Sequence, residues 1–90
     1  MSYFIIEPGD KRLELDSIVE IFKSKKNVNI NLDKSVYNTQ GRLYELDLQV
    51  SNSNSTAAKS ASPFKEAIAI LIINDKITIT TPEKVKETMF

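Results

Sequence analysis

Three carboxylates on two predicted strands are the residues whose spacing could hold a divalent cation. Glu45 and Asp47 stand two apart in an alternating run, so both side chains lie on one face of that strand. Asp33 belongs to the preceding alternating run, and oxygen ligands of this kind suit Mg²⁺ or Ca²⁺. Any exposed sheet face shows the same alternation, however, and Lys34 or Arg42 can pair with these acids across the strands. The pattern favours a solvated face, and we predict no metal site.

Other catalytic chemistry is limited by the residues that the chain lacks. It has no histidine and no cysteine, so neither a Ser–His–Asp nor a Cys–His arrangement can be built. Its two glycines, Gly9 and Gly41, are too far apart for a glycine-rich phosphate loop. A serine such as Ser35 or Ser60 could pair with a lysine base, but no spacing singles one out. We therefore expect no enzymatic activity, no cofactor and no small-molecule ligand.

A group of basic and aromatic residues gives the alternative of a single-stranded nucleic-acid-binding protein. Tyr37 and Tyr44 could stack on bases, while Arg42, Lys34 and the lysines of 23–26 contact phosphates. The lysines are interspersed with acids, and Tyr44 shares the parity of the apolar positions of its strand, which predicts burial. Twelve Lys and Arg also balance twelve Asp and Glu, so the chain lacks the basic excess of a typical nucleic-acid binder.

Length and composition indicate one small domain, residues 1–90, without covalent or membrane support. Ninety residues with 41% hydrophobic content suffice for a modest core, and the absence of cysteine leaves no disulfide framework. The longest apolar run has seven residues, whereas a membrane-spanning helix needs about 20. The N-terminus also lacks the basic start of a signal peptide. We expect a cytoplasmic protein, or one acting inside a host cell if a virus encodes it.

The elements that must position these residues begin with strands and one clear helix. Alternation predicts a strand over 3–7 and a second, returning strand over 11–15. A helix is predicted over 17–26, because Ser17 and Glu20 form a capping box before an apolar stripe at helical spacing. Lysines occupy its last turn, where positive charge complements the helix dipole.

The middle of the chain predicts a long antiparallel hairpin followed by a loop. Hydrophobic residues alternate with polar ones over 28–37 and again over 42–50, with a turn between them. Gly41 is available there for a left-handed conformation. The segment 51–62 is almost entirely Ser, Asn, Ala and Thr without apolar periodicity, so we expect a mobile loop.

The end of the chain predicts a short helix. Thr81 is a suitable cap, and Pro82 fits the first helical position. Val85 and Met89 lie four residues apart and would dock this helix, with Phe90 adding to the same face.

The most hydrophobic stretch of the chain, Ala67 to Thr81, predicts a second hairpin. Seven apolar residues are followed by Asn74 and Asp75, both of which tolerate the positive φ of a tight primed turn. Isoleucine and threonine then alternate over 76–81, as in a half-buried strand. A rival reading has a helix over 63–73, begun by a serine cap and a proline, but its β-branched isoleucines favour the strand.

The apolar run 67–73 has two faces to bury, which suggests a partner surface. If the two short helices do not cover both faces, another protein or a second copy would do so. We therefore predict that the interface contains two N-terminal aromatic residues and three isoleucines: Tyr3, Phe4, Ile68, Ile70 and Ile72. The alternative is that the helices over 17–26 and 82–90 cover both faces.

These patterns combine into a predicted α+β fold, a mainly antiparallel sheet of five or six strands in hairpins with two helices packed on it. The predicted function is a non-enzymatic protein–protein interaction module, such as an adaptor, a small inhibitor or an assembly subunit. Self-association into a homo-oligomer is part of this prediction, because zero net charge gives little repulsion between copies.

Overall fold

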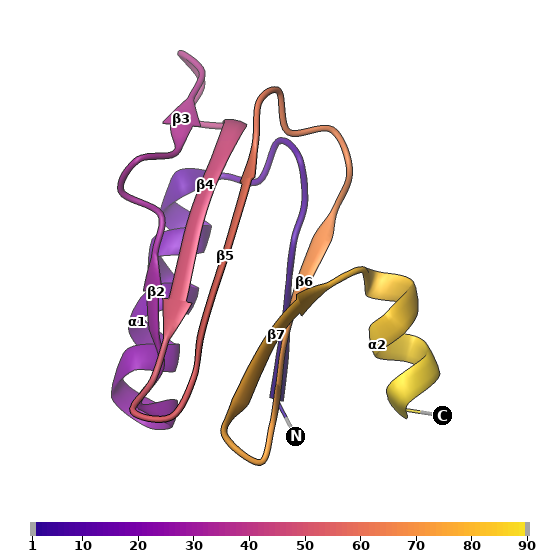
Figure 1. Cartoon of the computed structure of the whole chain (residues 1–90). Helices are drawn as coiled ribbons and strands as arrows, with labels where there is room; N and C mark the ends of the chain where they lie inside the picture. The colour runs from indigo at the N-terminus through magenta and orange to yellow at the C-terminus, as the bar shows by residue number, and fades with distance from the viewer. Residues whose placement is uncertain (1, 90) are drawn as a thin grey trace.

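The computed structural model of the chain describes residues 2–89, without the side chain of Met89. Over these residues it is an α+β fold with two helices and two antiparallel sheets (Figure 1). In chain order the elements are β1 (Ser2–Ile6), α1 (Arg12–Lys26), β2 (Asn29–Asn31), β3 (Val36–Tyr37), β4 (Leu43–Ser51), β5 (Thr56–Ala61), β6 (Ile68–Ile73), β7 (Lys76–Thr80) and α2 (Pro82–Met89). The predicted fold class is confirmed at this level.

The strands divide between two sheets, so the prediction of a single sheet of five or six strands is wrong. One sheet has three strands in the order β1-β6-β7, and the other has four, with β4 at its centre. Their neighbouring edges are β5 and β7, and no backbone ladder joins these two strands within residues 2–89. The side chain of Ser55, the residue before β5, links the two sheets instead, because the Ile77 amide of β7 donates to Ser55 Oγ at 3.0 Å.

The three-stranded sheet contains the predicted isoleucine-rich hairpin. Strands β6 and β7 pair antiparallel, with Ile72 opposite Ile77. The turn between them places Asn74 at φ 50° and Asp75 at φ 65°, as a primed turn requires. The hairpin is therefore confirmed and the rival helix over 63–73 is wrong, in keeping with the β-branched residues of this run.

The four-stranded sheet contains the other predicted hairpin, with an interruption. Strands β2 and β3 pair in turn along one edge of β4, and residues 32–35 leave the ladder between them. Ser35 replaces the missing backbone contacts, since its Oγ donates to the Asp47 carbonyl at 3.0 Å and accepts from the Asp47 amide at 2.8 Å. Gly41 has φ 73°, as predicted for the turn.

Strand β5 lies where the sequence predicted a loop, so that prediction is wrong for Thr56–Ala61. This strand pairs along the other edge of β4 in an unbroken antiparallel register. Ala57 and Ala61 pack against the core from it. The turn before β5 is stabilised by Asn52 Oδ1, which accepts from the amides of Asn54 and Ser55 at 2.8 Å.

Helix α1 begins five residues earlier than the capping box predicted. Residues 12–15 belong to it, so the predicted strand 11–15 is wrong. Leu15 and Phe22 are its buried residues, a helical spacing of seven, while Leu13 is 80% exposed. Ser17 does not cap the helix but donates from Oγ to the Leu13 carbonyl at 3.1 Å. The helix ends as predicted, at a left-handed Asn27.

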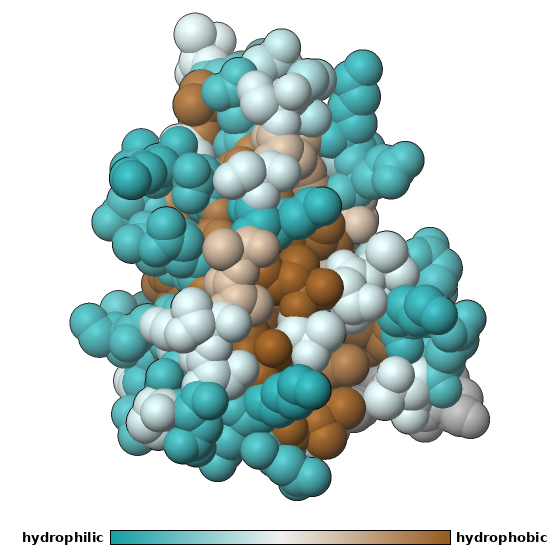
Figure 2. All heavy atoms as spheres, in the orientation of Figure 1, coloured by the Kyte–Doolittle hydropathy of each residue, from teal (hydrophilic) through white to brown (hydrophobic). Residues whose placement is uncertain are grey.

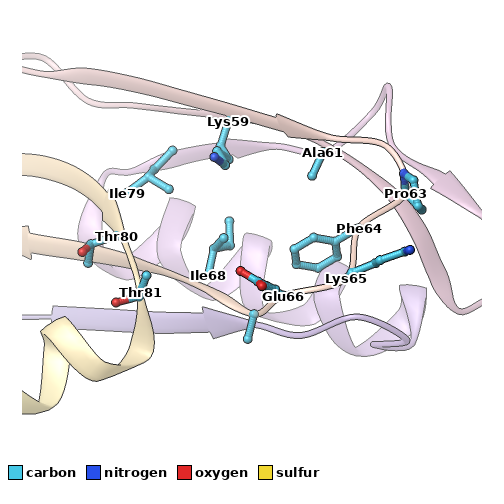
Figure 3. A pocket seen from close by; sticks show the side chains of 11 residues that line it. Lys59, Ala61, Pro63, Phe64, Lys65, Glu66, Ile68, Ile79, Thr80 and Thr81 are labelled. Carbon is cyan, nitrogen blue, oxygen red and sulfur yellow. The ribbon is translucent and has the colours of Figure 1, made fainter.

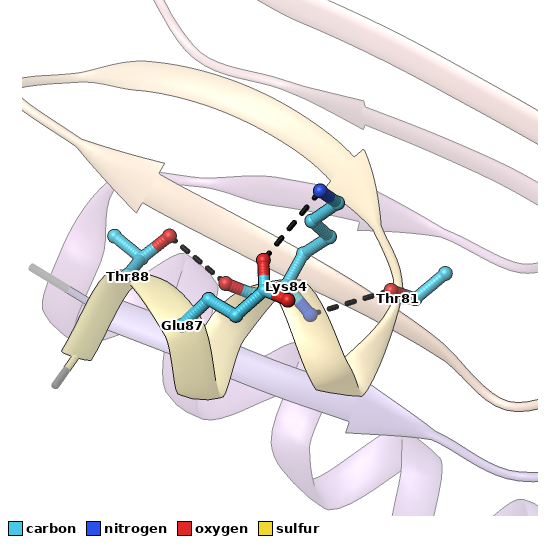
Figure 4. A network of polar contacts seen from close by, with 4 residues as sticks. All are labelled: Thr81, Lys84, Glu87 and Thr88. Atoms are coloured by element: carbon cyan, nitrogen blue, oxygen red, sulfur yellow. Dashed lines mark hydrogen bonds and ion pairs between the residues drawn. The ribbon is translucent and has the colours of Figure 1, made fainter.

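Helix α2 begins at the predicted cap. The Lys84 amide donates to Thr81 Oγ1 at 3.3 Å, and Lys84 forms an exposed ion pair with Glu87 at 3.5 Å (Figure 4). Val85 is 2% exposed and packs with Ala69 and Leu71, so its predicted docking role is confirmed. The side chains of Met89 and Phe90, which were predicted to share this role, lie outside the described residues.

The core lies between the two sheets and α1. Phe4 of β1 and Phe22 of α1 meet there with ring centroids 5.9 Å apart. Helix α2 covers part of the opposite face of β6, so both faces of the apolar run are covered by the chain itself over much of its length. Neither helix is long and apolar enough to cross a membrane.

Candidate functional site

A groove opens between the two sheets where β5 and β7 diverge. It has a volume of about 460 Å³. Strand β5, the crossing segment 62–67, the start of β6 and the end of β7 form its walls. Figure 2 shows hydrophobic side chains reaching the surface along the line between β5 and β7. The groove is therefore an open surface feature with an apolar interior.

Within residues 2–89, the edge of β5 that faces this groove pairs with no other strand. Alternate residues of an antiparallel strand bond to the neighbouring strand, and those between them point away from it. The Asn52 amide donates to the Ser55 carbonyl at 3.0 Å, which sets this alternation for the hairpin of β4 and β5. It follows that the amides and carbonyls of Ala58 and Ser60 point away from β4, toward the groove.

The facing edge of β7 is open in the same way but over a shorter length. The Ile77 amide points away from β6, since it donates to Ser55 Oγ. Two residues on, Ile79 must point its backbone groups in the same direction. Ile79 therefore adds one amide and one carbonyl on this side.

A polar clasp joins the two sheets beyond the other end of β5, away from the groove. Asn52 Nδ2 donates to the Asp75 carbonyl at 2.9 Å, and Ser55 Oγ accepts from the Ile77 amide at 3.0 Å. Both contacts link the β4–β5 turn to the β6–β7 hairpin. The two strands are thus held together at one end and separated at the other.

The interior of the groove is apolar and its rim is charged. Figure 3 shows Phe64 and Ile68 pointing into the hollow, with Ile79 at its side. Phe64 is held in place because its amide donates to the Tyr44 carbonyl at 2.9 Å. Lys59, Lys65 and Glu66 also line the groove, and all three are exposed. Such a site suits an apolar group attached to a polar backbone.

The structure places four of the five predicted interface residues in the core. Phe4, Ile68, Ile70 and Ile72 are at most 9% exposed, and of these four residues Ile68 lines the groove. Only Tyr3, at 45%, has the expected exposure. The second sheet, which the prediction of a single sheet did not include, covers these residues together with α1.

The predicted nucleic-acid residues do not form one platform. Tyr37 pairs with Leu43 across the strands and packs at the core beside α1, with the Arg12 guanidinium carbon 5.3 Å from its ring centroid. Tyr44 is 55% exposed, contrary to the predicted burial, because a bulge opposite β3 shifts the parity of β4 at this residue. Arg42 is exposed and donates from Nη1 to the Gly9 carbonyl at 3.2 Å.

The three predicted carboxylates are not grouped as metal ligands would be. Asp33 lines a hollow between α1 and the β2–β3 segment, together with Arg12 and Tyr37. Glu45 accepts a hydrogen bond from Ser62 Oγ at 2.8 Å on the other side of the sheet. Within residues 2–89 no three acidic side chains are grouped as metal ligands would be.

Sequence reasoning missed the groove because β5 has no hydrophobic alternation of the usual strength. Two features of the sequence do point toward it. Phe64 is an isolated aromatic residue in a polar segment, and Ala57 and Ala61 place small apolar side chains four residues apart. Neither feature specifies a groove without the sheet arrangement.

Comparisons with family models, curated proteins and solved structures yield no match to this chain.

Proposed function

We propose that this chain is a non-enzymatic protein–protein interaction module that binds an extended segment of a partner protein in the groove between β5 and β7. The observation that supports this function is the combination of an open strand edge with an apolar hollow beside it. A strand edge selects an extended backbone, and a hollow selects the side chains that the backbone carries.

The partner segment pairs with β5 in this proposal. Ala58 and Ser60 offer two amides and two carbonyls, whereas Ile79 offers only one of each. An apolar side chain of the segment then enters the hollow between Phe64, Ile68 and Ile79. Every second residue of the segment donates and accepts backbone hydrogen bonds with β5, and the residues between them point away from β5.

The first experiment selects ligands from a phage-displayed library of random peptides and measures the selected peptide by fluorescence anisotropy. Replacing Ser60 with proline removes the outward amide, a change that an edge strand tolerates. Ser60→Ala keeps the amide and is the matched control. We expect Ser60→Pro to weaken binding about tenfold, corresponding to about 1.4 kcal/mol, and Ser60→Ala to leave it unchanged.

A second measurement leaves the protein unaltered, so it is independent of whether the proline variant folds. Methylating the peptide amides one at a time removes one donor at each position. We expect the affinity to fall at alternate positions only. A peptide whose affinity is indifferent to methylation at every position, or a library that yields no ligand sensitive to Ser60→Pro, contradicts the proposal.

A further inference from the structure

The free edge of β1 is a second surface, on the opposite side of the three-stranded sheet from the groove. The strand order β1-β6-β7 makes β1 and β7 the two edges of that sheet. Within residues 2–89, β1 pairs with β6 on one side and with no strand on the other. Its outer backbone groups are therefore available for pairing.

The registers of the sheet determine which residues of β1 point outward. Ile72 of β6 lies opposite Ile77 on one side and opposite Ser2 on the other. The Ile77 amide points away from β6, so the backbone groups of Ile72 point toward β1. Ser2 then bonds to β6, and the alternation leaves the amides and carbonyls of Tyr3 and Ile5 on the outer edge.

This edge lacks the features by which proteins usually prevent edge pairing. Its sequence, Ser-Tyr-Phe-Ile-Ile, contains no charge, no proline and no glycine, and its register with β6 has no bulge. Tyr3 is 45% exposed beside it, and Ile73 of the same sheet is 37% exposed. An uncharged, aromatic edge strand of this kind is suited to pairing with another strand.

We propose that β1 pairs antiparallel with β1 of a second copy across a two-fold axis, with Phe4 opposite Phe4 of that copy. In this register Tyr3 lies opposite Ile5 of the second copy, and Ile5 opposite its Tyr3. The outward amides of Tyr3 and Ile5 in each copy, four in all, then donate to the outward carbonyls of the other copy. The Glu7 amide is already bonded to Asp10 Oδ2 at 2.9 Å, so a register shifted toward Glu7 forms fewer bonds.

The side chains agree with the same register. Cross-strand neighbours share a face of the sheet, so each exposed Tyr3 covers the partly buried Ile5 of the other copy. Phe4 belongs to the core face, where Phe22 already contacts it. The product is one six-stranded sheet in which both grooves stay open, because the β7 edges lie at its two ends.

A second copy fits this edge better than a charged partner does. The strand is its own complement in the antiparallel register, as a two-fold interface requires. Neither Tyr3 nor Ile5 carries charge, and the chain as a whole has none in excess. The proposed peptide function does not depend on this pairing, since the two surfaces use different strands.

The first test is the mass in solution, measured by sedimentation equilibrium at micromolar concentration. We expect a dimer for the natural chain and a monomer for Tyr3→Lys, since lysine on an edge strand opposes pairing. Tyr44→Lys is the matched control, because it changes a comparably exposed tyrosine of the other sheet, and it should remain a dimer. A monomeric natural chain, or equal masses for the two variants, overturns the proposal.

The second test reads the register and does not depend on the lysine variant. The natural chain has no cysteine, so any disulfide reports introduced residues. Opposed residues have Cα atoms about 5.5 Å apart, which suits a disulfide, whereas diagonal neighbours are about 7–8 Å apart. A mixture of Tyr3→Cys and Ile5→Cys chains should cross-link at least about tenfold faster than either alone, given these distances. Equal rates in all three samples contradict this register.

Discussion

Replacing Ser55 with alanine tests one of the two clasp contacts that join the β4–β5 turn to the β6–β7 hairpin. The Ile77 amide donates to Ser55 Oγ at 3.0 Å, and Ile77 is 5% exposed. Alanine removes the acceptor and leaves the amide without a protein partner. A buried donor left unsatisfied costs about 1–3 kcal/mol. Because this amide faces an open strand edge that water can reach, we expect a loss of about 1–2 kcal/mol in the free energy of unfolding.

Urea unfolding followed by far-ultraviolet circular dichroism measures this loss. In a chain of this size, 1 kcal/mol lowers Tm by about 4–8 °C, which a thermal scan resolves easily. Ser24→Ala is the matched control. Its Oγ donates to the Glu20 carbonyl at 2.9 Å on the exposed face of α1. There the higher helix propensity of alanine should offset the lost bond and leave stability unchanged or raised by up to about 0.5 kcal/mol.

A double-mutant cycle that combines Ser55→Ala with Asn52→Ala extends the test from one hydrogen bond to the whole clasp. Asn52 donates to the Asp75 carbonyl and accepts from the Ser55 amide, so the two residues share one structure. We expect the double variant to lose less than the sum of the two single losses, by about 0.5–1 kcal/mol. Equal urea midpoints for Ser55→Ala and Ser24→Ala would refute the reasoning, and strict additivity would refute the coupling.

Three further predictions concern single residues. Ser35→Ala leaves the Asp47 amide and carbonyl without their partner and should cost about 1–3 kcal/mol in urea unfolding; a loss no larger than for an exposed serine contradicts it. Asp75 has φ 65°, so Asp75→Ala should cost about 1 kcal/mol while Asp75→Gly costs nothing; equal stabilities argue against strain at this turn. Burial, followed by the charge of Asp16, raises the pKa of Tyr37 above 10.0. The contribution of the neutral Tyr37 side chain to stability is therefore complete below pH 10 and is lost as the pH rises through the pKa of the folded state. When the free energy of unfolding is measured across this pH range, a Tyr37→Phe variant should not show this loss.

The parts of the fold that the sequence predicts correctly are those where several local patterns agree. For the hairpin around Asn74 and Asp75, the β-branched run, the turn residues and the alternation that follows all indicate one structure. For α2, the Thr81 cap and the proline after it indicate a helix start that the hydrogen bond to Thr81 confirms. Agreement between independent local preferences is what makes an element predictable.

The start of α1 was mispredicted because a short run fits two periods. Leu13 and Leu15 alternate with charged residues as in a strand, and they also fit the first turn of a helix. Leu15 is buried and Leu13 is exposed, which only the helical period explains. The capping box at Ser17 was misleading, since Ser17 lies within the helix and bonds back to Leu13.

Tyr44 shows that parity alone does not predict burial across a bulge. Val36 lies opposite Glu45 and Tyr37 opposite Leu43, so Tyr44 is the extra residue of β4. Leu46, Leu48 and Val50 face the core at even positions, whereas Leu43, on the other side of Tyr44, faces it at an odd position. A bulge depends on the pairing of two strands and is not encoded in either alone.

The burial of the isoleucines predicted for the interface has a cause that also explains the groove. A single sheet would leave one side of β6 exposed, but the chain folds its two hairpins against each other and buries Ile68, Ile70 and Ile72 between them. Phe64 enters at the end where the sheets diverge, and its amide is tied to β4. The strands β5 and β7 are thereby kept from pairing along their whole length. Continuous pairing would have used both edges and filled the hollow. The division of the sheet therefore leaves a strand edge and an apolar hollow side by side, the two features on which the proposed function rests.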